Sequence, residues 1–362
     1  MVVAAADVPL QSSSGGTAVS SSGSSMVRPA FPIAPHEFFR RVPAPPRETT
    51  TKKAPPAPAL AEEGGDELRL SDLEHVCDLG EGACGVVTKV RHRRTGAVFA
   101  LKMAHYGGPD DEEAEALRLC AGSPHVVRCH AVLSGTCADG GGEAPAYVLE
   151  LMDAGTLAGV LGRRGGRGFP EHALAEVAAR CLQGLEHAHS RGVAHLDMRP
   201  DNLLANSGGD VKIGDFSVSR ILYDGERRRR RVSVAAGSPM YLSPERFEPD
   251  ARAGPRGAAA ADVWGLGVTV LELFLGRCPF LGPGGVKLPF EKLRQAICDA
   301  EPPSAPESAA ASPELRGFLA ACLQKDPRRR ATVTQLLAHP FVARRSVDES
   351  RRALRELIVE TL

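Results

Sequence analysis

The pattern of apolar positions divides the chain into stretches of different character. Residues 1–66 are dominated by Ser, Gly, Ala and Pro and show no apolar periodicity, so we predict a disordered tail. From residue 70 to about residue 150, short β-rich runs such as 98–101 and 147–149 surround one helical stretch near residues 111–120. This arrangement predicts a small, mostly antiparallel lobe with one main helix.

A change to helical periodicity marks a second, larger lobe. Apolar side chains recur at the spacing of one helix face, at Leu174, Val177, Ala178, Cys181, Leu182 and Leu185. The pattern therefore predicts an α+β, bilobal architecture, with a β-rich N-lobe at about 67–150 and a helical C-lobe at about 151–342. Residues 343–362 are predicted to form a C-terminal helical tail.

Composition and charge restrict the kinds of molecule that the chain is expected to bind and the compartment in which it is expected to lie. Lys plus Arg and Asp plus Glu both number 44 in the 362 residues, so no overall field favours nucleic acid or membrane. The nine cysteines form no C-x-x-C pair and follow no secretory signal, which favours a reduced, cytoplasmic chain. The longest apolar run, 268–275, is far shorter than the roughly 20 residues of a membrane span. The Ser-rich, acid-poor tail also fits an organelle transit peptide, although an ordinary linker is the preferred interpretation.

A glycine-rich segment follows the first apolar strand. Gly80, Gly82 and Gly85 would let backbone amides approach the phosphates of ATP without a Cβ in the way. Taken alone, the pattern fits a flexible hairpin equally well. The residues of this segment predicted to contact nucleotide are Leu79, Gly80, Glu81, Gly82, Ala83, Cys84, Gly85, Val86 and Val87. We interpret Cys84 as structural rather than reactive.

A lysine and an acidic helix follow that segment. Lys102 ends the strand at 98–102, where its ammonium group can contact the α and β phosphates. Glu113 is our choice for the carboxylate that holds this lysine. Glu115 lies two residues further on and hence on a different helix face, so only one of the two can point at Lys102.

The strongest chemical signal lies in the C-lobe. Asp197 and Asn202 are five residues apart, and Asp215 follows a short apolar run. Asp197 is predicted to orient a substrate hydroxyl and accept its proton, with Arg199 supplying positive charge near the γ-phosphate. Asn202 and Asp215 are predicted to hold Mg²⁺ between the phosphates. We interpret His195 as a packing and hydrogen-bonding residue.

At these residues the chain resembles the protein kinase family, from about residue 70 to residue 342. Segment 237–245 is similar to the part of a kinase that receives the substrate, and Arg329 is the expected partner of Glu245. Segments 123–130, 151–157 and 243–247 resemble MAP kinase kinases, and among these the plant MAP kinase kinase 10 type.

The resemblance implies an enzyme that uses ATP and Mg²⁺ to phosphorylate protein hydroxyls. It implies a MAP kinase as substrate, modified on Thr and Tyr, and an upstream MAP kinase kinase kinase, with neither nucleic acid nor membrane as partner. It also implies further nucleotide-binding positions: Ala100, Leu149 and Leu204 in the adenine pocket, Glu150 and Met152 in the hinge, and Asp153 near the ribose.

Several positions depart from the family pattern. Leu196 stands where the family has Arg, Arg199 where it has Lys, and Ser217 where it has Gly. The two places usually held by Ser or Thr in the activation loop hold Arg228 and Val234. Because Leu196 removes a cation that a loop phosphate would neutralise, we expect activity that is independent of phosphorylation, with Ser233 as the main threat to this idea.

Two other functions stay open at this point. A pseudokinase scaffold would explain the departures, and a generic Ser/Thr kinase would explain the absence of a convincing docking motif in the tail. The five consecutive arginines at 227–231 fit a solvated loop, a nuclear import signal or a contact with an acidic partner. We prefer an active kinase, because every group needed for ATP and metal is present.

Overall fold

The computed structural model describes residues 68–82, 84–105, 112–136, 143–222, 237–247 and 255–362. The chain divides into two units, Met1–Arg41 and Val42–Leu362, and all described residues belong to the second. The predicted tail, Ala83 and the segment that holds Arg228, Ser233 and Val234 therefore lie outside the described residues.

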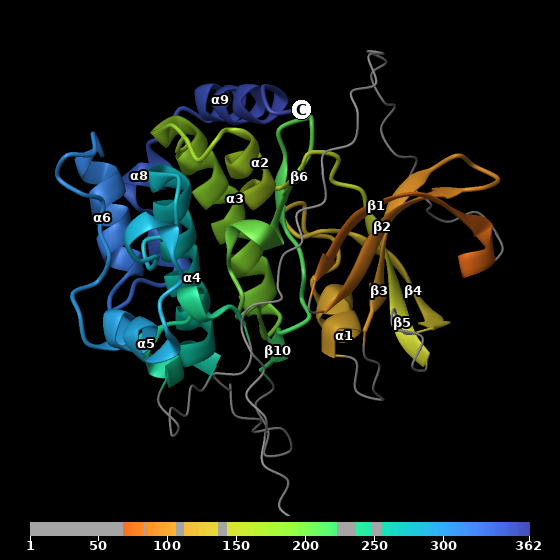
Figure 1. The fold of residues 1–362 in the computed structure, drawn as a ribbon, viewed down its shortest axis with the longest axis horizontal. Coiled ribbons are helices and arrows are strands. Elements are labelled where there is room, and N and C mark those ends of the chain that lie inside the picture. Colours follow the sequence, from red (N-terminus) through yellow and green to blue (C-terminus); the bar gives the residue numbers. More distant parts are fainter. Residues whose placement is uncertain (1–67, 83, 106–111, 137–142, 223–236, 248–254) are drawn as a thin grey trace, which may run out of the picture. The chain divides into compact units, whose positions relative to one another are not determined.

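The small lobe is a five-stranded antiparallel sheet with one helix (Figure 1). Its strands, in the spatial order β1-β2-β3-β5-β4, are β1 (Leu73–Gly82), β2 (Gly85–His92), β3 (Val98–Ala104), β5 (Glu143–Glu150) and β4 (Cys129–Thr136). Alternation along β3 separates two surfaces, because Phe99 and Leu101 pack in the core of this lobe while Ala100 belongs to the main core cluster. Lys102 follows the same alternation as Ala100, which directs it toward helix α1 (Glu112–Leu119).

The large lobe is mainly helical, as the periodicity predicted. Its helices are α2 (Leu157–Arg163), α3 (Glu171–Ser190), α4 (Pro255–Leu275), α5 (Phe290–Cys298), α6 (Pro313–Cys322), α7 (Val333–Leu337), α8 (Pro340–Ala343) and α9 (Val347–Val359). Its short strands are β6 (Gly155–Thr156), β7 (Val193–Ala194), β8 (Leu203–Ala205), β9 (Val211–Ile213) and β10 (Arg220–Ile221). The predicted bilobal α+β fold is confirmed.

Helices α3 and α4 form the centre of this lobe. All six apolar positions predicted on α3 are buried: Leu174, Val177, Ala178, Cys181, Leu182 and Leu185. Helix α4 is long and apolar enough to cross a membrane, but 72% of its apolar window is buried within the protein, as in a core helix. Every cysteine that the structure describes is a free thiol.

The last helix, α9, packs on α3. Leu354, Leu357 and Ile358 are buried in the main core cluster, so the end of the chain contributes to the C-lobe core. A buried carboxylate on α3, that of Glu176, also accepts a hydrogen bond from Arg351 on α9. The segment predicted as a helical tail is thus helical and packed along this lobe (Figure 1).

One predicted ion pair is wrong in its partner. Glu245 binds Arg330, not Arg329, through two hydrogen bonds of 2.7 and 2.9 Å. The Arg330 side chain is fully buried, whereas Arg329 is exposed. Arg330 also lies over the ring of Trp264, 5.2 Å from its centroid. In a run of consecutive arginines, sequence alone does not tell which side chain points inward.

This pair gives a test of stability. We expect Arg330→Ala to lower the free energy of unfolding by about 3–5 kcal/mol, because the substitution leaves the Glu245 carboxylate without its counter-charge in a largely buried place. Urea unfolding measures the change. Arg329→Ala is the matched control and should change the free energy of unfolding by less than about 0.5 kcal/mol. Equal losses in the two variants would contradict the assignment.

Candidate active site

The centre of the site is a lysine held by two carboxylates from different parts of the fold. Lys102 on β3 donates to Glu113 on α1 at 2.6 Å and to Asp215 at 2.8 Å. Burial by itself lowers the pKa of Lys102, but the nearby charges of Asp215 and Glu113 outweigh it and raise this pKa. Burial likewise raises the pKa of Asp215, and the ammonium of Lys102 reverses this and lowers it to about 2. Lys102 and Asp215 are therefore both charged at neutral pH.

The choice between two glutamates on α1 is confirmed. Glu113 contacts Lys102, while Glu115 pairs with Arg118 on the same helix at 2.7 Å. Glu112 reaches Arg220 on β10 at 3.2 Å. Helix α1 is thus tied to the sheet by Glu113 and to the C-lobe by Glu112.

The predicted catalytic carboxylate is held by two donors. Asn202 donates its amide N–H to the side chain and to the backbone oxygen of Asp197, both at 2.8 Å. The backbone N–H of Ser238 donates to the other carboxylate oxygen of Asp197 at 2.7 Å. Arg199 donates to the Ser238 hydroxyl at 2.5 Å and pairs with Asp201. Because Asn202 uses its nitrogen here, its amide oxygen stays available as a metal ligand.

Two residues of the site have positive backbone φ angles, which residues other than glycine rarely adopt. Leu196 has φ of 66° and Asp215 has φ of 55°. Asp262 on α4 stabilises the backbone conformation at Leu196, because its carboxylate accepts hydrogen bonds from the backbone N–H groups of His195 and Leu196. His195 is fully buried, bonds to the Gly214 carbonyl at 2.9 Å and meets the Phe216 ring edge-on. The interpretation of His195 as a packing and hydrogen-bonding residue is confirmed.

The glycine-rich segment forms the turn between β1 and β2, with Gly82 paired to Gly85. A Cβ at Gly85 would lie 2.2 Å from the carbonyl oxygen of Met103, so only glycine fits at this position. Cys84 accepts a hydrogen bond from the hydroxyl of Ser217 at 3.1 Å. Burial, followed by the negative charge of Asp215, raises the pKa of the Cys84 thiol, in agreement with a structural role.

The residues expected around adenine come together in part. Val87, Ala100, Leu149 and Leu204 all belong to or pack against the main core cluster, to which both lobes contribute. Met152 is buried, whereas Leu79, Glu81 and Gly82 are exposed along the turn.

The side chains of Glu150 and Asp153 already form hydrogen bonds within the protein. The Glu150 side chain accepts from Lys212 at 2.7 Å and from the backbone N–H of Arg128 at 2.7 Å. Both carboxylate oxygens of Asp153 accept from Ser207. The contact of Asp153 with ribose stays a prediction, because it requires this carboxylate to bind ribose in addition to Ser207.

The geometry fits ATP phosphates and a divalent cation. Lys102 supplies a fixed positive charge, while Asp215 and Asn202 offer hard oxygen ligands. Within the described ranges, no group of three or more His, Cys, Asp and Glu side chains could hold a metal ion. Phosphate oxygens of a bound nucleotide would add further ligands to a cation held by Asp215 and Asn202.

The fold and this site define a protein kinase. Residues 73–342 match the protein kinase domain family, and the chain belongs to it. Such a domain uses ATP and a divalent metal.

Within that family the chain is a MAP kinase kinase: it is 38% identical to mitogen-activated protein kinase kinase 9 of Arabidopsis thaliana, over 83% of this chain and 95% of the relative. It is also 38% identical to mitogen-activated protein kinase kinases 7 and 10 of the same plant, in each case over 76% of this chain and 86% of the relative. The resemblance drawn from the motifs is confirmed.

Some contacts of the site were not foreseen from sequence. They join residues far apart in the chain: Ser238 with Asp197, Arg220 with Glu112, and the buried Arg246, which donates to the Leu196 carbonyl at 2.8 Å. In the sequence, segments 237–245 and 243–247 indicate only a resemblance to kinases. Their approach to the catalytic carboxylate is a tertiary contact that no local pattern encodes.

Leu196, which stands where the family has arginine, packs against other apolar side chains. Its side chain forms a small apolar cluster with Ala194, Ala258 and Ala261, against which Leu222 packs. Leu222 follows β10, at the start of the segment that runs to Gly237. Apolar contact thus holds Leu222 at the place where the family pattern puts an arginine.

Proposed function

We propose that this MAP kinase kinase transfers the γ-phosphate of Mg²⁺-ATP to Thr and Tyr hydroxyls of a MAP kinase. The observation that carries the proposal is the simultaneous pairing of Lys102 with Glu113 and Asp215, which joins the two lobes in an arrangement suited to binding ATP phosphates. The printed names of the plant relatives support the choice of substrate class.

Each residue of the site has a task in this proposal. Lys102 binds the α and β phosphates, and Arg199 adds positive charge near the group being transferred. Asp197, fixed by Asn202 and Ser238, orients the substrate hydroxyl and takes up its proton as the oxygen attacks phosphorus. Asp215 and Asn202 hold the Mg²⁺, which when bound offsets the negative charge of the phosphates.

The pseudokinase alternative is not favoured. The charged groups that phosphoryl transfer requires are present and paired, and Lys102 is already in contact with the α1 glutamate. Ser217 and Leu196 change neighbouring packing without removing any predicted ligand or base.

A transfer assay tests the proposed function. The full chain is incubated with radiolabelled ATP, Mg²⁺ and a panel of kinase-dead MAP kinases, with casein as a general substrate. We expect label on Thr and Tyr of at least one MAP kinase and little on casein. Label on casein alone would favour a generic Ser/Thr kinase, and MAP kinase binding without label would favour a scaffold. Prior incubation with candidate MAP kinase kinase kinases tests the proposed upstream partner.

The apolar cluster at Leu196 leads to a prediction about activation. Because Leu196 takes part in this apolar cluster, a phosphate has no arginine at position 196 to neutralise. We expect phosphatase treatment to change kcat/KM by less than about tenfold, or about 1.4 kcal/mol in the barrier. A fall of about a hundredfold or more would show that phosphorylation, for example at Ser233, activates the enzyme.

A further inference from the structure

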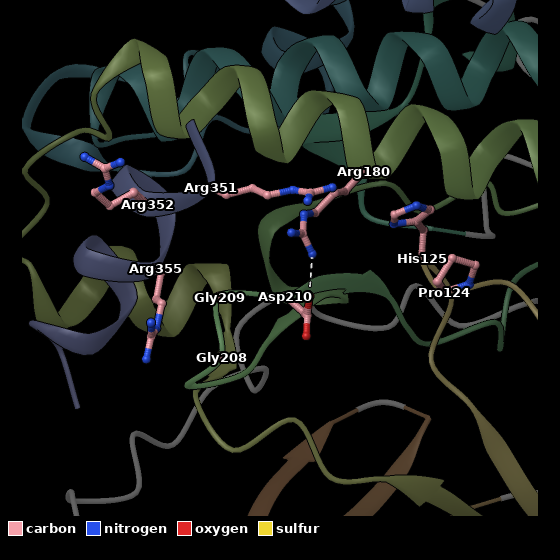
Figure 2. A pocket seen from close by; sticks show the side chains of 9 residues that line it. All are labelled: Pro124, His125, Arg180, Gly208, Gly209, Asp210, Arg351, Arg352 and Arg355. Atoms are coloured by element: carbon pink, nitrogen blue, oxygen red, sulfur yellow. Dashed lines mark hydrogen bonds and ion pairs between the residues drawn. The ribbon is translucent and has the colours of Figure 1, made fainter. Parts of the chain in front are cut away.

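A basic cavity lies in the C-lobe, between α3, the turn that joins β8 to β9, and α9. Its volume is about 690 Å³, and none of its lining residues belongs to the active site. Figure 2 shows Arg351 of α9 and Arg180 of α3 extending toward one another, with Asp210 bonded to Arg180. Arg355 lies beside the turn of Gly208 and Gly209.

Positive charge exceeds negative charge around this cavity. Four arginines line it (Arg180, Arg351, Arg352 and Arg355), and Asp210 is the one acidic residue among the lining residues. Behind them, the buried Glu176 binds Arg180 at 2.7 Å, Arg345 at 3.0 Å and Arg351 at 3.3 Å. Five guanidinium groups thus face two carboxylates.

Two of these arginines keep their charge for an external partner. Arg352 and Arg355 are exposed, and neither forms an ion pair with any residue that the structure describes. Arg180 pairs with both Glu176 and Asp210, and Arg351 pairs with Glu176, so these two side chains are held in place and their charge is largely compensated. The positive charge of Arg352 and Arg355 in this concavity attracts oxyanions.

The turn beneath α9 is built for close approach. Gly209 has φ of 90°, and a Cβ added there would lie 2.8 Å from the Cβ of Arg355. Glycine at this position therefore lets the turn lie directly against the helix, with no side chain to fill the space in front of the arginines.

The size of the cavity favours a ligand larger than a single phosphate ion. With a volume of about 690 Å³ and an opening to solvent, the cavity has room for more than a single phosphate ion. The planar guanidinium group of arginine binds two oxygens of one phosphate through paired hydrogen bonds, more strongly than it binds neutral acceptors. We propose that this cavity binds a phosphorylated peptide segment of a partner protein. The inference does not depend on the proposed function.

Fluorescence anisotropy of a labelled peptide tests the proposal. The probe is an eight-residue peptide with a central phosphoserine between Gly and Ala, measured against the full chain saturated with Mg²⁺ and a non-hydrolysable ATP analogue. Parallel arms use the unphosphorylated peptide, the peptide with Glu in place of phosphoserine, inorganic phosphate as competitor, and a single-stranded RNA of eight nucleotides.

The variant Arg352→Glu/Arg355→Glu replaces these two positive charges of the cavity with negative ones. The matched control is Arg328→Glu/Arg329→Glu, which changes two exposed arginines outside the cavity by the same net charge. We expect the phosphopeptide to bind at least tenfold tighter than its unphosphorylated form, and the cavity variant to lose at least tenfold while the control loses less than twofold. The Glu peptide should bind with intermediate affinity.

Four outcomes would overturn the proposal. The first is equal binding of the phosphorylated and unphosphorylated peptides. The second is an equal loss in the control variant. In the third, inorganic phosphate competes as well as the peptide, which would indicate a small-anion site. In the fourth, the RNA binds tighter than the phosphopeptide through the same arginines, which would indicate a nucleic-acid surface.

Discussion

Replacing Asp197 with Asn is expected to lower kcat by about a thousandfold while leaving the affinity for ATP nearly unchanged. The amide keeps the shape of the side chain and can still meet the N–H of Ser238 with its oxygen. It cannot take up the proton of the substrate hydroxyl, so the loss falls on the chemical step. Single-turnover phosphorylation of a MAP kinase, together with nucleotide binding by fluorescence, measures the two quantities separately.

Asp215→Asn provides the contrast to this variant. The Asp215 carboxylate pairs with Lys102 and is the proposed metal ligand, so its loss should weaken metal-dependent nucleotide binding as well as turnover. The same two measurements apply. If both substitutions reduced nucleotide affinity equally, the division of tasks between Asp197 and Asp215 would be wrong.

Lys102→Met is expected to lower kcat/KM by at least about a thousandfold, because it removes the only positive charge held between Glu113 and Asp215 among the described residues. Methionine keeps much of the aliphatic stem, so the fold should persist, as circular dichroism will show. The radiolabel assay gives the turnover.

Lys102→Arg serves as the comparison for that variant. Its charge is the same, but a planar guanidinium cannot replace a compact ammonium group between two carboxylates at 2.6 and 2.8 Å. We expect it to recover only a small part of the activity. Substantial turnover in Lys102→Met would rule out the proposed role of the lysine in binding phosphate.

The parts of the site that sequence predicted are those set by local geometry. Lys102 ends a predicted strand, and helical spacing allowed only one of Glu113 and Glu115 to reach it. Asp197 and Asn202 meet because they lie in one short loop.

The parts that sequence missed depend on packing between distant segments. Arg330 rather than Arg329 binds Glu245 because helix and loop packing decides which of two neighbours is buried. From sequence, Leu196 indicates only that an arginine is missing. Its cluster with Ala258 and Ala261 could not be predicted, because it depends on how α4 packs beside the catalytic loop. Apolar residues without periodicity carry no signal of their partner.

The shared carboxylate of Glu176 has a consequence for how this lobe can change during evolution. One buried side chain, 1% exposed, forms ion pairs with three arginines that come from α3, from the segment after α8 and from α9. Loss of any one arginine leaves two others to balance the carboxylate, whereas loss of the carboxylate leaves three cations without their common partner. We therefore expect natural variation to substitute these arginines one at a time, and to keep the glutamate for as long as the last helix stays in place.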